Sequence, residues 1–318
     1  MTTLPQQSVL APAGAAAGSI YQLWTLMLWV SVVVFGVVLA LVLMALMRAT
    51  RRKRANGPSP ASSRALTQAV SAAVGLTVAI LFALLVASLW TSRSTAVHAS
   101  GAVTINVTGH RWWWEVEYQD AVPERRMLTA NEIHIPVNRP VVLVVTSRDV
   151  IHSFWAPNLQ GKRDLIPGYT TAIWMQADRP GISRGQCAEF CGLQHAHMAF
   201  DVVAEPESDF NRWLEAMRQP SGPPQSPIEQ RGLDVFRTAR CATCHTVRGT
   251  DAHGQVAPDL THIATRSTLG AGTLPNTPEH LDAWVRDPQA SKPGNQMPPN
   301  PLSRDDLHAL LAYLETLK

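Results

Sequence analysis

Cysteine occurs in this chain only as two tight pairs, and each pair is followed by further residues that can bind a metal. Cys187 and Cys191 are separated by three residues and precede a histidine and a methionine. Cys241 and Cys244 are separated by two residues, and His245 follows them directly. Thiolate, imidazole and thioether groups together are typical of copper electron-transfer sites, whereas Cys-x-x-Cys-His is typical of covalent haem attachment. Two redox centres in one chain indicate an electron relay.

The loop after the first pair offers two thiolates, an imidazole and a thioether, from Cys187, Cys191, His195 and Met198. A mononuclear blue copper site uses one cysteine, so the second thiolate is surplus unless it bridges a second metal. A second histidine must then come from elsewhere, and His152, which follows a predicted strand, is the best candidate. Two alternatives are a disulfide, which a three-residue loop disfavours, and tetrahedral zinc on two cysteines and two histidines.

The second pair forms a specific haem motif, in which both thiols would form thioethers with haem vinyl groups and His245 would be the proximal iron ligand. Met297 is the only methionine after the motif. Because methionine as distal ligand raises the haem potential, as an electron donor to copper requires, we expect Met297 to be the sixth ligand. Four histidines are alternatives by residue type alone: His253, His262, His280 and His308.

Two uncharged segments precede these motifs, since residues 1–47 and 65–92 contain no Lys, Arg, Asp or Glu. Each includes an apolar run long enough to cross a hydrocarbon core of about 30 Å. The loop between them holds six basic residues and no acidic one, so the positive-inside rule places it in the cytoplasm and both cysteine pairs on the other side. A cleaved signal peptide is the alternative for the first segment, but that segment lacks a basic n-region.

Net charge disfavours nucleic acid as a partner. The chain carries a formal charge of +3, and the basic loop alone supplies +6, which leaves −3 for everything else. The redox motifs therefore lie in a slightly acidic part of the chain, which lacks the basic excess needed for phosphate contacts. The partner that the composition does indicate is a lipid bilayer.

Short strands separated by Pro and Gly follow the second apolar segment. Alternating or β-branched runs predict strands at 103–107, 112–118, 141–145, 170–175 and 200–203. Many short strands with regular turns indicate a β-sandwich or barrel. A short helix is expected at 209–217, and a Pro-rich linker then leads to a helical region with helices at 228–240 and 305–317. Ser303, three residues before Asp306, predicts a helix cap.

Residues 20–217 resemble cytochrome c oxidase subunit II, which has two transmembrane helices and a cupredoxin domain with the binuclear copper centre CuA. The matching pieces are Gly109-His-Arg-Trp112-Trp-Trp114, Val150-Ile-His152-Ser-Phe-Trp, Asp164-Leu-Ile-Pro-Gly168 and the run from Cys187 to Met198. Residues 227–318 resemble a class I cytochrome c. The resemblance implies a multi-domain membrane protein with a two-helix transmembrane hairpin, a cupredoxin-like β-sandwich or barrel, and an all-α cytochrome c domain.

The resemblance and the linker together set the expected boundaries. These are an N-terminal segment at 1–19, transmembrane helices at 20–47 and 66–92, a basic cytoplasmic loop at 48–65, a cupredoxin CuA domain at 99–217, a Pro-rich linker at 218–227 and a cytochrome c domain at 228–318. The family usually carries an acidic residue, a Trp and a Pro at the start of its second helix. This chain has none of them there, so the sequence gives no support for proton uptake through it.

The resemblance also implies roles for single residues. Cys187 and Cys191 would bridge two coppers, His152 and His195 would bind one copper each, Met198 would be a weak axial ligand, and Glu189 would supply its backbone carbonyl. The Glu189 side chain would reach a magnesium site shared with subunit I. Trp112 would lie at the surface above CuA and admit electrons. One covalent haem c would be held by Cys241, Cys244, His245 and Met297.

The implied function is that of subunit II of a haem-copper cytochrome c oxidase, in the bacterial cytoplasmic membrane with both redox domains on the periplasmic side. Electrons from a bc complex or a soluble cytochrome c would reach haem c, then CuA, then an a-type haem in subunit I; subunit III is a further expected partner. Oxygen reduction to water, coupled to proton translocation, would take place in another chain, so this chain contributes positioning and redox tuning.

Two other functions share parts of this pattern. The CuA subunit of a nitric oxide or nitrous oxide reductase has the same copper loop, and co-purification with a subunit that contains a-type haem would exclude it. A membrane-tethered electron carrier without a catalytic partner is the non-enzymatic alternative. Such a carrier should be stable in detergent by itself, whereas an oxidase subunit should be isolated in a stoichiometric complex.

Overall fold

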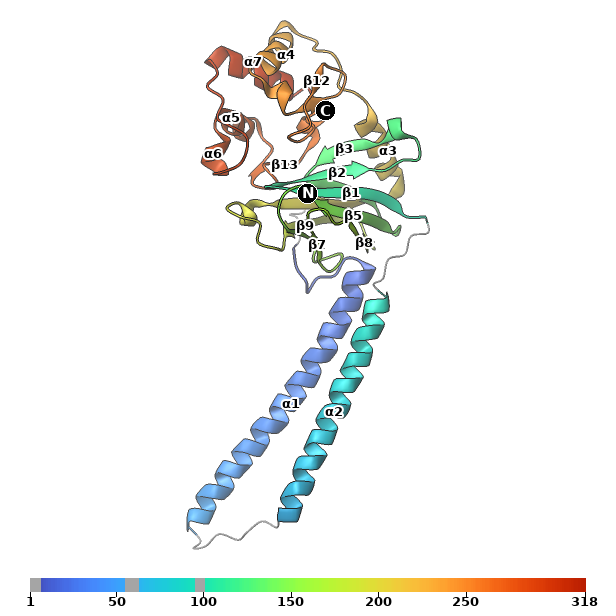
Figure 1. Cartoon of the computed structure of the whole chain (residues 1–318), viewed down its shortest axis with the longest axis vertical. Coiled ribbons are helices and arrows are strands. Elements are labelled where there is room, and N and C mark those ends of the chain that lie inside the picture. Colours follow the sequence, from blue (N-terminus) through green and yellow to red (C-terminus); the bar gives the residue numbers. More distant parts are fainter. Residues whose placement is uncertain (1–6, 55–62, 95–100) are drawn as a thin grey trace. The chain divides into compact units, whose positions relative to one another are not determined.

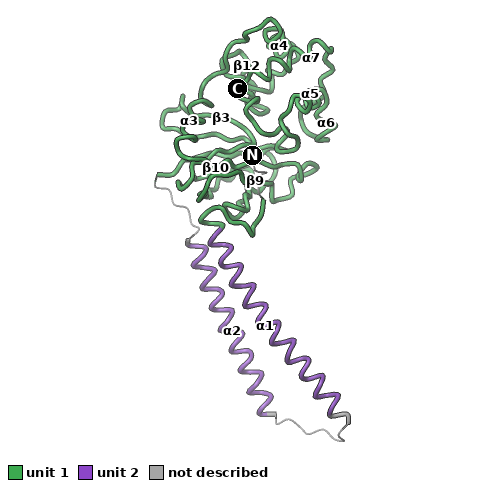
Figure 2. Tube along the Cα trace, turned by 180° about the vertical axis from the view of Figure 1, so that it is seen from behind, with its two compact units in different colours: residues 1–17, 97–318 green, residues 18–96 purple. Residues whose placement is uncertain are grey.

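The computed structural model describes residues 7–54, 63–94 and 101–318. Two compact units make up the chain, and Figure 2 shows them in different colours: residues 18–96 form one, and residues 1–17 together with 97–318 form the other. Each unit contains one part of the predicted organisation, the apolar helices in the first and the redox motifs in the second.

Two long helices, α1 (Ala15–Arg54) and α2 (Ser63–Ser94), contain the apolar segments. Their spans Ala15–Arg51 and Arg64–Arg93 have mean hydropathies of 3.0 and 2.6 and are long and apolar enough to cross a membrane. The most apolar stretch of 18 residues in each span contains no buried residue, as expected of helices that lipid or another membrane protein would cover. The chain is therefore membrane-anchored. Of the predicted basic loop, residues 48–54 continue α1, and residues 55–62 lie outside the described part.

The larger unit contains two five-stranded sheets (Figure 1). The first sheet has the order β3 (Met127–Ala130), β2 (Trp113–Tyr118), β1 (Val103–His110), β5 (Val141–Ser147), β8 (Thr171–Met175). The second has the order β4 (Glu132–Pro136), β10 (Ala199–Glu205), β9 (Gly181–Cys187), β6 (His152–Trp155), β7 (Arg163–Leu165). Trp114 of the first sheet packs edge-on against Phe154 and Phe200 of the second. The predicted β-sandwich is confirmed.

The alternation in the sequence predicted the face that each strand buries. In β2, Trp114, Val116 and Tyr118 are buried and the residues between them are partly exposed. The predicted strands are confirmed as β1, β2, β5, β8 and β10. Strands β3, β4, β6, β7 and β9 were not predicted. Of these, β6 buries three consecutive residues and β7 has only three residues, so neither shows a period of two.

The segment before α1 packs against the sandwich. The Ser8 N–H donates to Oδ1 of Asn158 over 3.0 Å, and the Asn158 side-chain amide donates to the Ala11 carbonyl over 2.7 Å. The Ala13 N–H donates to the Asn158 carbonyl over 2.7 Å. Ala16 is buried as well. Residues 8–17 therefore contribute hydrogen bonds and packing to the redox unit.

We expect Gly14→Ala to destabilise this unit. A Cβ added at Gly14 would lie 2.1 Å from the Gln176 carbonyl oxygen, so backbone would have to move. Such overpacking costs about 1–3 kcal/mol, which thermal unfolding followed by circular dichroism would detect. Gly18→Ala is the matched control, because a Cβ at Gly18 meets nothing within 4 Å. Equal melting of the two variants would contradict the close contact at Gln176.

The helical region begins after α3 (Glu207–Arg218) and contains α4 (Pro227–Thr238), α5 (Pro278–Arg286), α6 (Pro288–Ser291) and α7 (Arg304–Leu314). The ring of Phe236 in α4 meets the ring of Tyr313 in α7 edge-on, with centroids 6.1 Å apart. The Ser303 hydroxyl accepts a hydrogen bond from the Asp306 N–H, which confirms the predicted cap. Two short ladders are added to the expected all-α pattern, β11 (Thr246–Val247) with β12 (Ala252–His253) and β13 (Thr268–Leu269) with β14 (Leu274–Pro275).

Candidate metal centre and haem cavity

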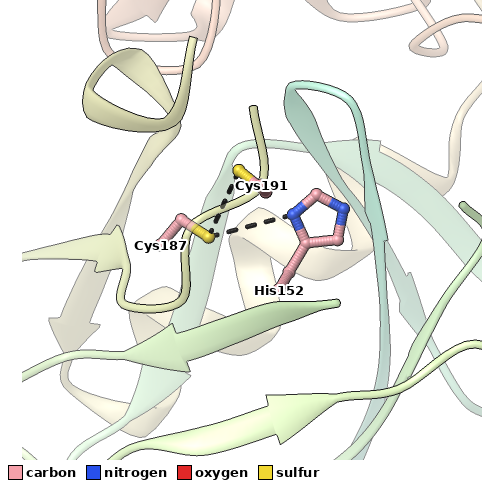
Figure 3. Close-up of side chains that lie close together, drawn as sticks. All are labelled: His152, Cys187 and Cys191. Atoms are coloured by element: carbon pink, nitrogen blue, oxygen red, sulfur yellow. Dashed lines mark hydrogen bonds between the residues drawn. The ribbon is translucent and has the colours of Figure 1, made fainter. Parts of the chain in front are cut away.

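The first cysteine pair meets a histidine where strand β9 ends and strand β6 begins (Figure 3). The Cys187 sulfur lies 3.7 Å from the Cys191 sulfur and 3.8 Å from Nδ1 of His152. Cys187 ends β9 and His152 begins β6, and the ladder between these strands pairs Phe154 with Cys187. Sheet pairing thus places His152 beside the loop, and all three residues are buried.

The remaining predicted donors of the loop converge on the same sulfurs. The Cys191 sulfur lies 3.6 Å from Nδ1 of His195 and 3.8 Å from the Met198 sulfur. The Glu189 carbonyl oxygen lies 3.2 Å from the Cys187 sulfur. His197, by contrast, is exposed, and its Nδ1 lies 2.8 Å from Oε1 of Gln194.

This donor set fits a copper site of the CuA kind. The hydrogen bond with Cys191 lowers the pKa of Cys187 to about 3, and the hydrogen bond with Cys187 raises the pKa of Cys191. Two thiolates at this distance repel each other unless a cation lies between them. The separation of 3.7 Å is also far longer than a disulfide bond of about 2.05 Å. A tetrahedral zinc site would leave the thioether and the carbonyl without a role, whereas copper uses both.

Asp149 orients the first histidine and was not identified from the sequence. Its Oδ1 lies 2.9 Å from Nε2 of His152, so Nε2 carries the proton and Nδ1 is left to face Cys187. Burial alone would raise the pKa of Asp149, but the hydrogen bonds from His152 and from backbone N–H groups outweigh it and lower this pKa. Carboxylates of this kind commonly fix the ring of a ligand histidine, so an Asp three residues before His152 was the available signal.

The second cysteine pair lines a cavity of about 440 Å³, which we call the haem-type cavity. Its wall includes all four predicted haem residues, Cys241, Cys244, His245 and Met297, and apolar side chains such as Leu260, Ile263, Leu281 and Leu314. Nδ1 of His245 lies 2.7 Å from the Pro258 carbonyl oxygen, so Nδ1 carries the proton and Nε2 is the nitrogen available to iron. Burial lowers the pKa of His245, which keeps the ring neutral as a metal ligand must be.

None of the four alternative histidines is among the described residues that line this cavity. Nε2 of His262 lies 3.0 Å from the Gln219 carbonyl oxygen, and Nδ1 of His280 lies 3.1 Å from the Thr277 hydroxyl. His253 and His308 are exposed. The cavity with its two cysteines, one histidine and one methionine fits a covalent haem.

Trp112 connects the two sites. It lines the haem-type cavity, and its indole N–H donates to the Cys191 carbonyl over 2.9 Å. The expectation that Trp112 lies at the surface is wrong, since only 9% of it is exposed. The chain around Gly294 covers it, because a Cβ built on Gly294 would lie 3.9 Å from the indole ring. Trp113 also lines the cavity, but its ring stacks on His110 at a centroid distance of 4.3 Å.

The fold and both sites together define a membrane-anchored electron-transfer protein with a copper-type sandwich domain and a haem-type helical domain. Residues 121–205 match the family model "Cytochrome C oxidase subunit II, periplasmic domain", and residues 229–318 match the model "Cytochrome c". The chain belongs to the cytochrome c oxidase subunit II family and carries a C-terminal cytochrome c domain.

Two bacterial relatives support this assignment by sequence. Cytochrome c oxidase subunit 2 of Alkalihalophilus pseudofirmus is 40% identical over 217 residues, which are 68% of this chain and 61% of that protein. The protein of the same name from Bacillus sp. PS3 is 33% identical over 228 residues, 68% of this chain and 62% of the relative. The chain thus spans 61 to 62% of the length of these two relatives. The crystal structure of the periplasmic domain of subunit II of cytochrome oxidase of Bradyrhizobium japonicum is 30% identical and covers 38% of this chain and 97% of that domain, with a TM-score of 0.36.

Proposed function

We propose that this chain is the electron-transfer subunit of a haem-copper cytochrome c oxidase in a bacterial cytoplasmic membrane, with both redox domains on the periplasmic side. The observation that carries this proposal is the position of Trp112, which lines the haem-type cavity and donates a hydrogen bond to the Cys191 carbonyl. One aromatic side chain thus joins the wall of the first site to a ligand residue of the second. Reduction of oxygen and proton translocation belong to the partner subunits.

The donor atoms have separate roles in the copper site. Cys187 and Cys191 would supply two thiolates to a copper pair, His152 and His195 would each supply an imidazole, and Met198 and the Glu189 carbonyl would be weaker donors. Copper bound here would supply one-electron redox chemistry. The protein contributes rigidity, because His152 and Cys187 lie on paired strands and Asp149 fixes the His152 ring. Burial of both sulfurs excludes water from the ligands.

The haem site lies in the cytochrome c domain, and its histidine is also oriented by a hydrogen bond. Cys241 and Cys244 would attach haem c covalently, and His245 and Met297 would be the residues that bind its iron. The Pro258 carbonyl fixes the His245 ring through Nδ1, so the orientation of Nε2 is set by the backbone. A bc complex or a soluble cytochrome c is the electron donor.

The surface next to the copper loop is suited to subunit I. The Glu189 side chain is exposed while its carbonyl faces Cys187, so the side chain is free to reach a magnesium site shared with that subunit. Phe190 and Leu193 are 76% and 71% exposed. Neighbouring exposed apolar side chains that form a patch commonly mark a protein–protein contact. Subunit III is a further partner of the complex.

Metal analysis and spectroscopy of the purified complex test this function. We expect two coppers per covalent haem c, a mixed-valence copper signal in electron paramagnetic resonance, and a co-purifying subunit with a-type haem. Fewer than two coppers per haem c would contradict the copper assignment. A chain that is stable in detergent without an a-type haem subunit would instead favour the membrane-tethered carrier.

A further inference from the structure

Lys292 is buried where the cytochrome c domain contacts the sandwich, and only 2% of it is exposed. Its ammonium nitrogen donates to the Trp112 carbonyl over 2.8 Å, to the His197 carbonyl over 2.7 Å and to the Gly270 carbonyl over 2.6 Å. An ammonium group has three hydrogens, so these three acceptors satisfy all of its donors.

The three carbonyls come from both domains. Trp112 and His197 belong to the sandwich; Trp112 lines the haem-type cavity, and His197 directly precedes Met198 of the copper loop. Gly270 belongs to the cytochrome c domain, like Lys292 itself. A single cation therefore ties the backbone of Trp112 to the domain that contains the cavity.

Two further hydrogen bonds join the cytochrome c domain to the sandwich near Lys292. The Ala199 N–H at the start of β10 donates to the Ala271 carbonyl over 3.0 Å. The Gln194 side-chain amide donates to the Pro293 carbonyl over 2.7 Å. Two segments of the cytochrome c domain, around residues 271 and 293, thus lie on the copper loop and on the strand that follows it.

Burying a lysine at this contact costs free energy, because its charge is removed from water. An apolar side chain of similar length would cover the same surface without removing a charge from water. Burial lowers the pKa of Lys292 to about 7, although the nearby Cys191 sulfur raises it. The ammonium group adds directional hydrogen bonds, and three donors around one nitrogen determine where three backbone segments lie.

We propose that Lys292 is a positioning residue that holds the cytochrome c domain over Trp112, so that electrons leave the haem cavity from one docked geometry. This inference rests on the proposed electron-relay function. In the docked arrangement the indole of Trp112 is covered, so an external donor delivers electrons to the cytochrome c domain and not to Trp112. The fused domain is then an obligatory part of the relay.

Hydrogen–deuterium exchange of the full-length protein in detergent tests the proposal. In Lys292→Met, three carbonyls lose their donor, and we expect amide exchange at Ala199 and in residues 268–273 to become about ten-fold faster or more. The matched control is Lys162→Met, because Lys162 is an exposed lysine of the sandwich domain and its replacement should leave these rates unchanged. Electron transfer between the two centres should become dependent on solvent viscosity only in the Lys292 variant.

Lys292→Arg is a second variant, to be used if Lys292→Met does not accumulate. In Lys292→Arg the charge remains, but the planar guanidinium cannot direct three donors from one nitrogen, so the same rise in exchange is expected. Wild-type exchange at Ala199 in Lys292→Met, or in Lys292→Arg if the first variant does not accumulate, would overturn the proposal. The exchange readout does not depend on copper, so this failure is distinct from a failure of the metal analysis, which would overturn the proposed function.

Discussion

Trp112→Leu is expected to slow electron transfer from haem c to CuA by roughly 100-fold, since misplacing the groups that connect two reacting centres has effects of this size. The substitution removes the aromatic ring from the cavity wall and the indole N–H that donates to the Cys191 carbonyl. Both losses lengthen the gap that the electron has to cross. The rate is measured after rapid photochemical reduction of haem c in the full-length protein.

Trp113→Leu is the matched control for this experiment. Trp113 also lines the cavity, but its ring stacks on His110 in place of a bond to the copper loop. We expect its replacement to change the rate by less than about three-fold, because the connection through Cys191 remains. Haem and copper contents should match wild type in both variants. Equal slowing by the two substitutions would show that the route does not depend on Trp112.

Cys191→Ala should abolish the binuclear copper site. The Cys191 sulfur is the neighbour of three other donors, those of Cys187, His195 and Met198, so its removal disconnects the set. We expect copper per haem c to fall from two to below about one, and the mixed-valence signal to disappear, because loss of supporting groups alone already weakens metal binding by 10–100-fold. Haem c should remain, since its attachment residues lie in the other domain.

His197→Ala separates a loss of ligand from a disturbance of the loop. His197 lies in the same loop as Cys191, but its ring is exposed and contacts Gln194. Both coppers should therefore remain in this variant. Loss of copper from His197→Ala together with its retention in Cys191→Ala would contradict the ligand assignment.

Local motifs made most of the two sites predictable. In each loop the donors lie within a dozen residues, so covalent spacing alone limits how far apart they can be. His152 was predicted as a ligand from its type and from the resemblance, although its position beside Cys187 depends on the ladder between β6 and β9. The helices α3, α4 and α7 were predicted because their apolar residues recur at helical spacing.

Lys292 was missed because a single Lys carries no periodicity, and its role depends on which groups the fold brings to it. Asp149 was missed although its partner His152 is only three residues away. Lys292 contacts the Trp112 carbonyl across a separation of 180 residues, and the Trp112 indole meets the Cys191 carbonyl across 79. Contacts of this length depend on the packing of whole domains, which no local pattern encodes.

The sequence by itself determined the chemistry: two cysteine motifs with their donors, two apolar spans and a chain of short strands followed by helices. Residue type and covalent spacing are sufficient for this, because ligand preference and hydrophobic period are local properties. The tertiary structure alone decided that Trp112 lies beneath the cytochrome c domain and that Lys292 joins the two domains. These are consequences of long-range packing, in which buried polar groups must find partners wherever the fold provides them.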